Sequence, residues 1–268
     1  MFDESAADAW RLRYGVDGPE LPDLGKFLNH RSVRRFRPDP IPESTMAGLV
    51  AAAQSAATSS NLQLWSIVSV QDPERRDAIA ELCSNQDQIR QAAWFLAFVA
   101  DVYRLGQAAA QVGIEAAGTD TTEFLVMACV DAALAAERMV CAAESLGIGV
   151  CYIGALRNDP GGVQKLLGLP TGTFGVFGLC LGWPEEPLTA EIKPRLAQSN
   201  VWHRERYDAS VDVSEYDERM RAFYRSQNMK GEVTWSMRSG RRADGSEKSM
   251  GGRERLAEWL ASQGLGRR

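Results

Sequence analysis

The feature that most constrains the fold is one long apolar segment, residues 121–146. Alanine, methionine, valine and leucine occupy nearly every face of the helix that this segment predicts, and Gly147 stands where a glycine commonly ends a helix. A helix that is apolar all round must be buried in a core or in a subunit interface. Because Asp131, Glu137 and Arg138 interrupt the segment, we do not expect it to span a membrane.

The segments around this helix carry helix and strand signals without a strict βαβ alternation, which predicts an α+β fold. Continuous apolar runs predict buried strands at 66–70, 94–102, 148–156 and 173–184. Other helices are predicted at 5–15, 21–31, 44–57, 72–83, 159–170, 213–227 and 252–264. The prolines predict an extended segment at 38–42, and the polar, glycine-rich composition predicts a mobile loop or arm at 228–252.

Composition narrows the class of protein. The chain has 268 residues and a net charge of -5, whereas proteins that bind nucleic acid through its phosphates usually carry a basic face. Its five cysteines are widely spaced and lie mostly in apolar runs, which indicates reduced thiols in the cytoplasm. Two histidines and the lack of a C-x-x-C pattern argue against zinc. We therefore expect a cytoplasmic protein without a metal, nucleic-acid or membrane partner.

The stretch HRSVRRFRPDPIP, residues 30–42, gathers four arginines and one histidine in its first eight residues. It is either a solvated charged surface or a clamp for a small anion, because arginine forks bind phosphate in a bidentate manner. Lys193 and Arg195 lie two residues apart on an extended segment and so point the same way. They could join His30, Arg31 and Ser32 around one phosphate, although two surface bases are the simpler interpretation.

Several common motifs are missing from the sequence. It has no P-loop, no dinucleotide-binding glycine fingerprint and no G-x-S-x-G pattern of a hydrolase. The segment TSSNLQ, residues 58–63, offers hydroxyl and amide groups, but by itself it indicates a helix end followed by a turn.

Taken in order, these segments resemble the flavin-dependent nitroreductase family, most closely its oxygen-insensitive, NADPH-preferring branch (group A). The resemblance is carried by HRSVRRF, TSSNLQ, NQDQI, YIGALRN, FGLCLGWP and KPRL, and covers roughly residues 22–235. It implies an α+β fold with a central, mostly antiparallel mixed sheet surrounded by helices, in an intertwined homodimer. It also implies an N-terminal extension at 1–21, an FMN-binding domain at 22–210 and a helical C-terminal arm at 211–268 that contacts the partner subunit.

The resemblance implies a set of residues that bind FMN. The arginine-rich stretch and the KPRL segment would hold the phosphate and ribityl end, Arg34 and Gln86 the pyrimidine edge, and the backbone N–H of Gly154 would donate to N5. The TSSNLQ segment would reach the flavin of the other subunit. The full implied set is His30, Arg31, Ser32, Arg34, Thr58, Ser59, Ser60, Asn61, Gln63, Gln86, Tyr152, Ile153, Gly154, Ala155, Lys193 and Arg195.

The resemblance further implies that the cofactor carries the chemistry and that no protein side chain is a catalytic nucleophile or base. NADPH or NADH would deliver a hydride to the flavin, and a nitroaromatic, a quinone or free flavin would then accept two electrons in a ping-pong cycle. Gln227 stands where this branch carries a basic residue for the NADPH 2′-phosphate, so Arg225 and Lys230 are the candidates for that contact and both nucleotides stay possible. The alternative is an FMN-binding protein with little turnover, a sensor or flavin reservoir.

Overall fold

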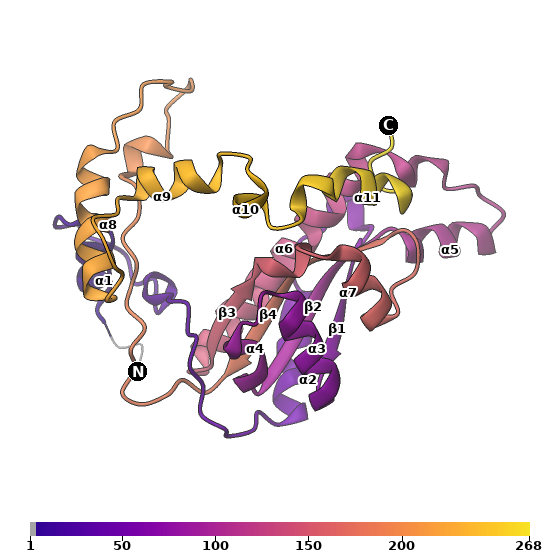
Figure 1. Ribbon diagram of the computed structural model, residues 1–268, viewed down its shortest axis with the longest axis horizontal. Helices are drawn as coiled ribbons and strands as arrows, with labels where there is room; N and C mark the ends of the chain where they lie inside the picture. The colour runs from indigo at the N-terminus through magenta and orange to yellow at the C-terminus, as the bar shows by residue number, and fades with distance from the viewer. Residues whose placement is uncertain (1–3) are drawn as a thin grey trace. The chain divides into compact units, whose positions relative to one another are not determined.

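The computed structural model describes residues 4–268, which contacts within the chain divide into two compact units (Figure 1). The first unit comprises the residues up to Arg31 together with 190–250, and the second comprises 32–189 together with 251–268. Each unit therefore joins segments that are distant in the sequence. The three-part division at residues 21 and 210 stays a prediction.

The second unit is built on one four-stranded sheet in the order β1-β2-β4-β3, in which every neighbouring pair is antiparallel. Beyond β3, Ser32 adds an isolated parallel bridge to Val150. The predicted strands and the α+β class are confirmed. The strands are β1 (Trp65–Val70), β2 (Trp94–Asp101), β3 (Gly149–Ile153) and β4 (Thr173–Gly182).

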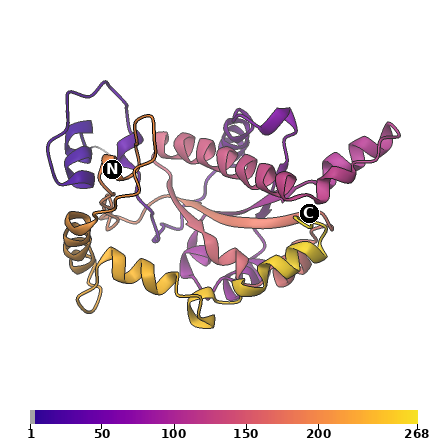
Figure 2. The same ribbon diagram turned by 90° about the horizontal axis from the view of Figure 1, so that it is seen from above.

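Helices cover both faces of this sheet. The long helix α6 and α2 lie along one face, while α3 and α7 lie against the other, as comparison of the two views shows (Figures 1 and 2). The helices of this unit are α2 (Glu43–Gln54), α3 (Pro73–Leu82), α4 (Asp87–Gln91), α5 (Tyr103–Gln111), α6 (Thr122–Ser145), α7 (Pro160–Leu167) and α11 (Leu256–Ser262).

Local sequence explains where these helices begin. Asp72 and Asp159 accept a backbone N–H from the first turns of α3 and α7, and each is followed by a proline at the first helical position. Thr121 caps α6 by accepting the N–H of Phe124. The inner face of α6 is lined with alanines, whose small side chains let the helix approach the sheet closely and join its largest apolar core.

The first unit consists of short helices around a separate small core. One face of α8 buries Tyr216, Met220 and Tyr224, which are four residues apart and so share one side of the helix. The helices are α1 (Ala6–Tyr14), α8 (Ser214–Ser226), α9 (Trp235–Arg242) and α10 (Glu247–Met250).

One prediction about this unit is wrong, and another holds in only one of its two alternatives. The predicted helix at 21–31 is only a 3₁₀ turn, Phe27–Asn29, because Pro22 and the left-handed Gly25 (φ 55°) interrupt a continuous helix. The segment 228–252, predicted as a mobile loop or an arm, contains α9 and α10, so it is not a plain loop, and the arm stays a prediction. There Thr234 caps α9 by accepting the N–H of Met237, and the ring of Trp235 lies 5.4 Å from that of Tyr216. Aromatic packing has thus ordered a segment whose composition indicated a loop.

Within residues 4–268, no helix combines the length and the apolar character that crossing a bilayer requires.

Candidate functional site

The basic residues that the sequence assigned to a phosphate fall mostly in the first unit, where Arg13 of α1 organises them. Its guanidinium is 7% exposed and donates to the carbonyl oxygens of Leu28 (2.8 Å) and His30 (3.2 Å). Its own carbonyl accepts the N–H of Arg195 at 2.9 Å. Arg13 therefore connects the segments around His30 and Arg195 to the same helix, α1. Sequence reasoning missed this role, because an arginine in the last turn of a short helix resembles an ordinary helix-end charge.

Arg31 is already ion-paired within the first unit. Its guanidinium is 5% exposed, lies 2.6 Å from the carboxylate of Glu4 and donates to the carbonyl of Asn29 at 3.2 Å. The nearby KPRL segment is anchored by the hydroxyl of Tyr216, which donates to the carbonyl of Pro194. An anion that bound Arg31 would have to compete with the Glu4 carboxylate for the same guanidinium group.

Arg34 and Gln86 line one polar cavity of about 660 Å³ in the second unit. Gln86 is fixed at both ends of its amide: Nε2 donates to the Cys83 carbonyl (3.0 Å), and Oε1 accepts from Gln88 (2.6 Å). The guanidinium of Arg34 makes one long hydrogen bond, 3.5 Å, to the carbonyl of Ser32. A pocket with a fixed amide and an adaptable cation is suited to a ligand rich in carbonyl oxygens.

The turn before Gln86 follows an unusual backbone path. Ser84 and Asn85 have φ of 64° and 54°, in the left-handed region that residues other than glycine rarely adopt. Asn85 itself lines the cavity. Strained backbone of this kind concentrates at ligand sites.

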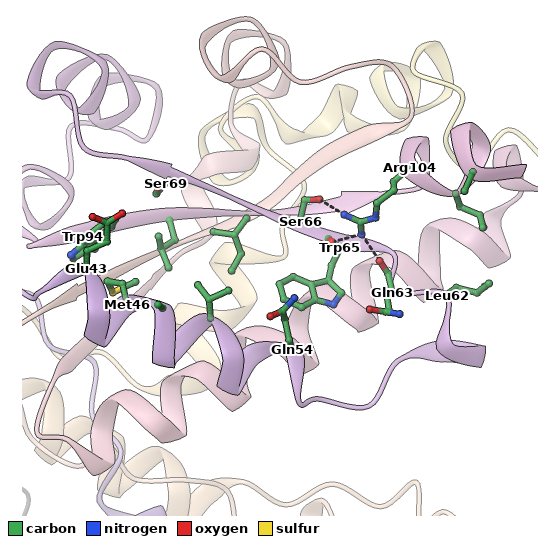
Figure 3. A pocket seen from close by; sticks show the side chains of 16 residues that line it. Glu43, Met46, Gln54, Leu62, Gln63, Trp65, Ser66, Ser69, Trp94 and Arg104 are labelled. Carbon is green, nitrogen blue, oxygen red and sulfur yellow. Dashed lines mark hydrogen bonds between the residues drawn. The ribbon is translucent and has the colours of Figure 1, made fainter. Parts of the chain in front are cut away.

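The end of the TSSNLQ segment, Leu62 and Gln63, lines a different cavity, of about 900 Å³, shown in Figure 3. The rest of the segment, residues 58–61, lines neither this cavity nor the one that contains Arg34. Gln63 and Trp65 lie at one end of it, beside Arg104 of α5. The guanidinium of Arg104 donates to the Ser66 hydroxyl (3.0 Å) and to the carbonyls of Gln63 (2.5 Å) and Trp65 (2.7 Å). No residue lines both this cavity and the one that contains Arg34. One chain thus places the two groups of predicted flavin residues at separate sites.

Residues 152–155 lie at the end of β3 and the start of a 3₁₀ turn, Gly154–Arg157. Ile153 and Ala155 are buried, whereas Tyr152 reaches the surface and donates its hydroxyl to the Glu137 carboxylate at 3.1 Å. Burial, and then the charge of Glu137, raise the pKa of Tyr152 well above its usual range. The phenol therefore stays protonated and keeps its role as a donor.

The buried cysteine thiols do not indicate a nucleophilic site. Burial raises the pKa of Cys83 to about 12, and it also raises the pKa of Cys129 and Cys180. Such thiols are poor nucleophiles near neutral pH. In the part of the chain that the structure describes, no group of three or more His, Cys, Asp or Glu side chains could hold a metal ion.

Comparison with known protein families assigns the chain to a family. A family model described as "Nitroreductase family" matches residues 28–183, and a second, for the C-terminal domain of that family, matches residues 193–268. The chain belongs to the nitroreductase family. The resemblance seen in the sequence motifs is therefore confirmed.

Named relatives align over most of the chain. It is 38% identical over 217 residues to "FMN reductase (NADPH)" of Bacillus subtilis, covering 78% of this chain and 86% of that protein. It is 36% identical over 245 residues to "NADPH-flavin oxidoreductase" of Vibrio harveyi, covering 90% of this chain and 97% of that protein. The solved structure of the NfrA1 nitroreductase from B. subtilis superposes with a TM-score of 0.83 at 34% identity, covering 90% and 98% of the two chains.

Proposed function

We propose that the protein is an FMN-dependent NAD(P)H oxidoreductase of the flavin-reductase and nitroreductase type. The observation that carries the proposal is the cavity that Arg34 and Gln86 share, in a chain whose relatives are named flavin reductases and oxidoreductases. When bound, FMN supplies the redox chemistry, accepting a hydride from the nicotinamide and passing two electrons to an acceptor.

The residues present fit this cofactor in each unit taken by itself. In the second unit, the Arg34 cation and the Gln86 amide match the carbonyl-rich pyrimidine edge of a flavin, and a cation there stabilises negative charge on the reduced ring. In the first unit, Lys193 and Arg195 supply positive charge for a phosphate and His30 offers a ring N–H, whereas Arg31 would first have to exchange its pairing with Glu4. Arg13 holds the segments around His30 and Arg195. These side chains bind and orient a ligand, and none of them needs to act as a nucleophile.

We also propose that the working form is a homodimer. On the outer face of α6, Val126, Val130 and Leu134 are 51%, 45% and 44% exposed and recur every four residues, so they form one apolar stripe. In the first unit the irregular segment 201–211 exposes Val201, Trp202, Tyr207 and Val211. An exposed apolar stripe along the longest helix is typical of a protein–protein interface, which supports the proposed dimer.

A cytoplasmic location is proposed on separate grounds. All five cysteines are free thiols, which is typical of proteins in a reducing compartment.

For the nucleotide, we expect Lys230→Ala and Arg225→Ala each to raise the KM for NADPH roughly fivefold, since an exposed ionic contact contributes about 1 kcal/mol. Arg225 is paired with Glu232 at 2.5 Å, so a 2′-phosphate would have to replace that carboxylate, whereas Lys230 is exposed. The KM for NADH, which lacks this phosphate, should not change. Lys26→Ala, an exposed lysine of the same unit, is the matched control. Equal effects on the two nucleotides would show that neither residue reads the 2′-phosphate.

The proposed activity is tested by turnover of the FMN-loaded protein. We expect NADPH oxidation that requires both FMN and an acceptor, with a nitroaromatic, a quinone and free FMN compared at equal concentration. A protein that retains FMN but oxidises neither NADPH nor NADH would instead be a flavin-binding protein without turnover.

A further inference from the structure

The inner face of α6 carries one buried charge, Asp131, which is 0% exposed. Around it on the same face lie the buried alanines Ala128, Ala132 and Ala135. A carboxylate in such surroundings is costly unless hydrogen bonds satisfy it. Its Oδ1 accepts the backbone N–H of Ser59 at 2.8 Å, and its Oδ2 accepts the backbone N–H of Leu64 at 3.0 Å. One side chain thus ties down both ends of the TSSNLQ segment.

The segment between these two contacts is strained. Ser60, Asn61 and Gln63 have φ of 49°, 57° and 53°, all in the left-handed region. Non-glycine residues in sparsely populated backbone regions carry strain and persist only where the surroundings enforce them. Inside the segment, a hydrogen bond from the Leu62 N–H to the Ser59 carbonyl closes a turn. The side chains of Ser60, Asn61 and Gln63 are exposed, so packing does not hold them.

We infer that Asp131 is the positioning residue for this segment, which we name the 58–63 loop, and that it sets the loop's conformation for binding FMN. The inference rests on the proposed function, together with the family resemblance, which implies that Thr58, Ser59, Ser60, Asn61 and Gln63 reach the flavin of the other subunit. Asp131 acts through the backbone of the loop and needs no contact with the flavin itself.

The position of Asp131 on α6 gives the inference a second consequence. Its neighbour Val130 belongs to the exposed apolar stripe, which lies about 100° further round the same helix. If that stripe contacts a second copy of the chain, α6 fixes the position of the 58–63 loop relative to the subunit interface. The loop must reach across this interface to contact the flavin of the other subunit. A rigid helix is well suited to this task because it fixes both contacts in one frame.

Asp131→Asn is the informative variant, because asparagine keeps the volume and one acceptor oxygen. Its NH₂ group would face one of the two backbone N–H donors, so one hydrogen bond is lost and two donors oppose each other. In the FMN-free protein we expect faster hydrogen exchange at the amides of Ser59 and Leu64, measured relative to the amides of β2. We expect the Kd for FMN to rise about 10- to 100-fold, as for the loss of a hydrogen bond to a charged group.

Met139→Ala is the matched control. Met139 lies two turns further along α6, is fully buried, and leaves a cavity when truncated, so the protein loses stability without a change at the loop. Exchange at Ser59 and Leu64 relative to β2, and the Kd for FMN, should stay within about twofold of the unmodified protein, a change of only ~0.4 kcal/mol. A purely structural role for Asp131 would instead make the two variants behave alike.

The outcomes separate this inference from the proposed function. If the unmodified protein binds FMN and Asp131→Asn binds it equally well, the inference is overturned and the proposed function stands. If the unmodified protein cannot be loaded with FMN, both are overturned. Should the variant fail to fold, exchange in the unmodified protein still decides: amides of Ser59 and Leu64 that exchange as fast as those of Ser60 and Asn61 would show that no such anchor exists.

Discussion

Leu134→Glu is expected to dissociate the proposed dimer and to release FMN in the same step. Leu134 lies in the apolar stripe of α6 and is 44% exposed in the isolated chain. In a two-fold symmetric interface the new carboxylate would be buried twice, once from each subunit. Burying an unpaired charge costs several kcal/mol per ion, so the dimer Kd should rise by about 1,000-fold or more, equivalent to ~4 kcal/mol.

Light scattering at micromolar concentration, read together with flavin absorbance, checks this expectation. Lys165→Glu is the control, since it also adds negative charge but lies exposed on α7, against the other face of the sheet. The control should stay dimeric and yellow. A Leu134→Glu protein that remains a dimer, or a monomer that retains its full complement of FMN, would contradict the proposed shared site.

Arg34→Ala is expected to weaken FMN binding by about 10- to 150-fold. The physical reason is the loss of a charged hydrogen-bond donor, which is worth about 1.5–3 kcal/mol, from the cavity that Gln86 also lines. The same loss should make the bound flavin harder to reduce, because the cation no longer stabilises the negative charge of the reduced ring. The midpoint potential should therefore become more negative in the variant.

FMN occupancy after dialysis, from the absorbance spectrum, measures the first effect. Arg37→Ala is the matched control: Arg37 belongs to the same arginine-rich stretch but does not line the cavity, and it pairs with Asp39 at 3.4 Å. Equal occupancy in Arg34→Ala, Arg37→Ala and the unmodified protein would show that Arg34 does not hold the flavin.

The strands and the long helix could be predicted because burial dictates their sequences. Continuous apolar runs such as Trp94–Asp101 have few alternatives to a buried strand, and the alanine-rich face of α6 requires a close-packed partner. The candidate cofactor residues came from ordered short motifs, of which the structure brings Arg34 and Gln86 into one cavity.

Features that depend on distant contacts could not be predicted. The helix α9 lies within a polar, glycine-rich segment, 228–252, and is ordered by the packing of Trp235 on Tyr216. Arg13 and Asp131 appear in the sequence as an ordinary surface charge and as an interruption of an apolar helix. Their roles depend on backbone groups 15 residues away for Arg13 and 67–72 residues away for Asp131, which no local pattern reveals.

The most direct test of the proposed activity is the absorbance spectrum of the purified protein, recorded without oxygen before and after NADPH or NADH is added. We expect a yellow protein whose flavin absorbance is bleached by nucleotide, and the ratio of the two bleaching rates gives the nucleotide preference. A yellow protein that neither nucleotide bleaches, or a colourless protein that cannot be loaded with FMN, would contradict the proposed function.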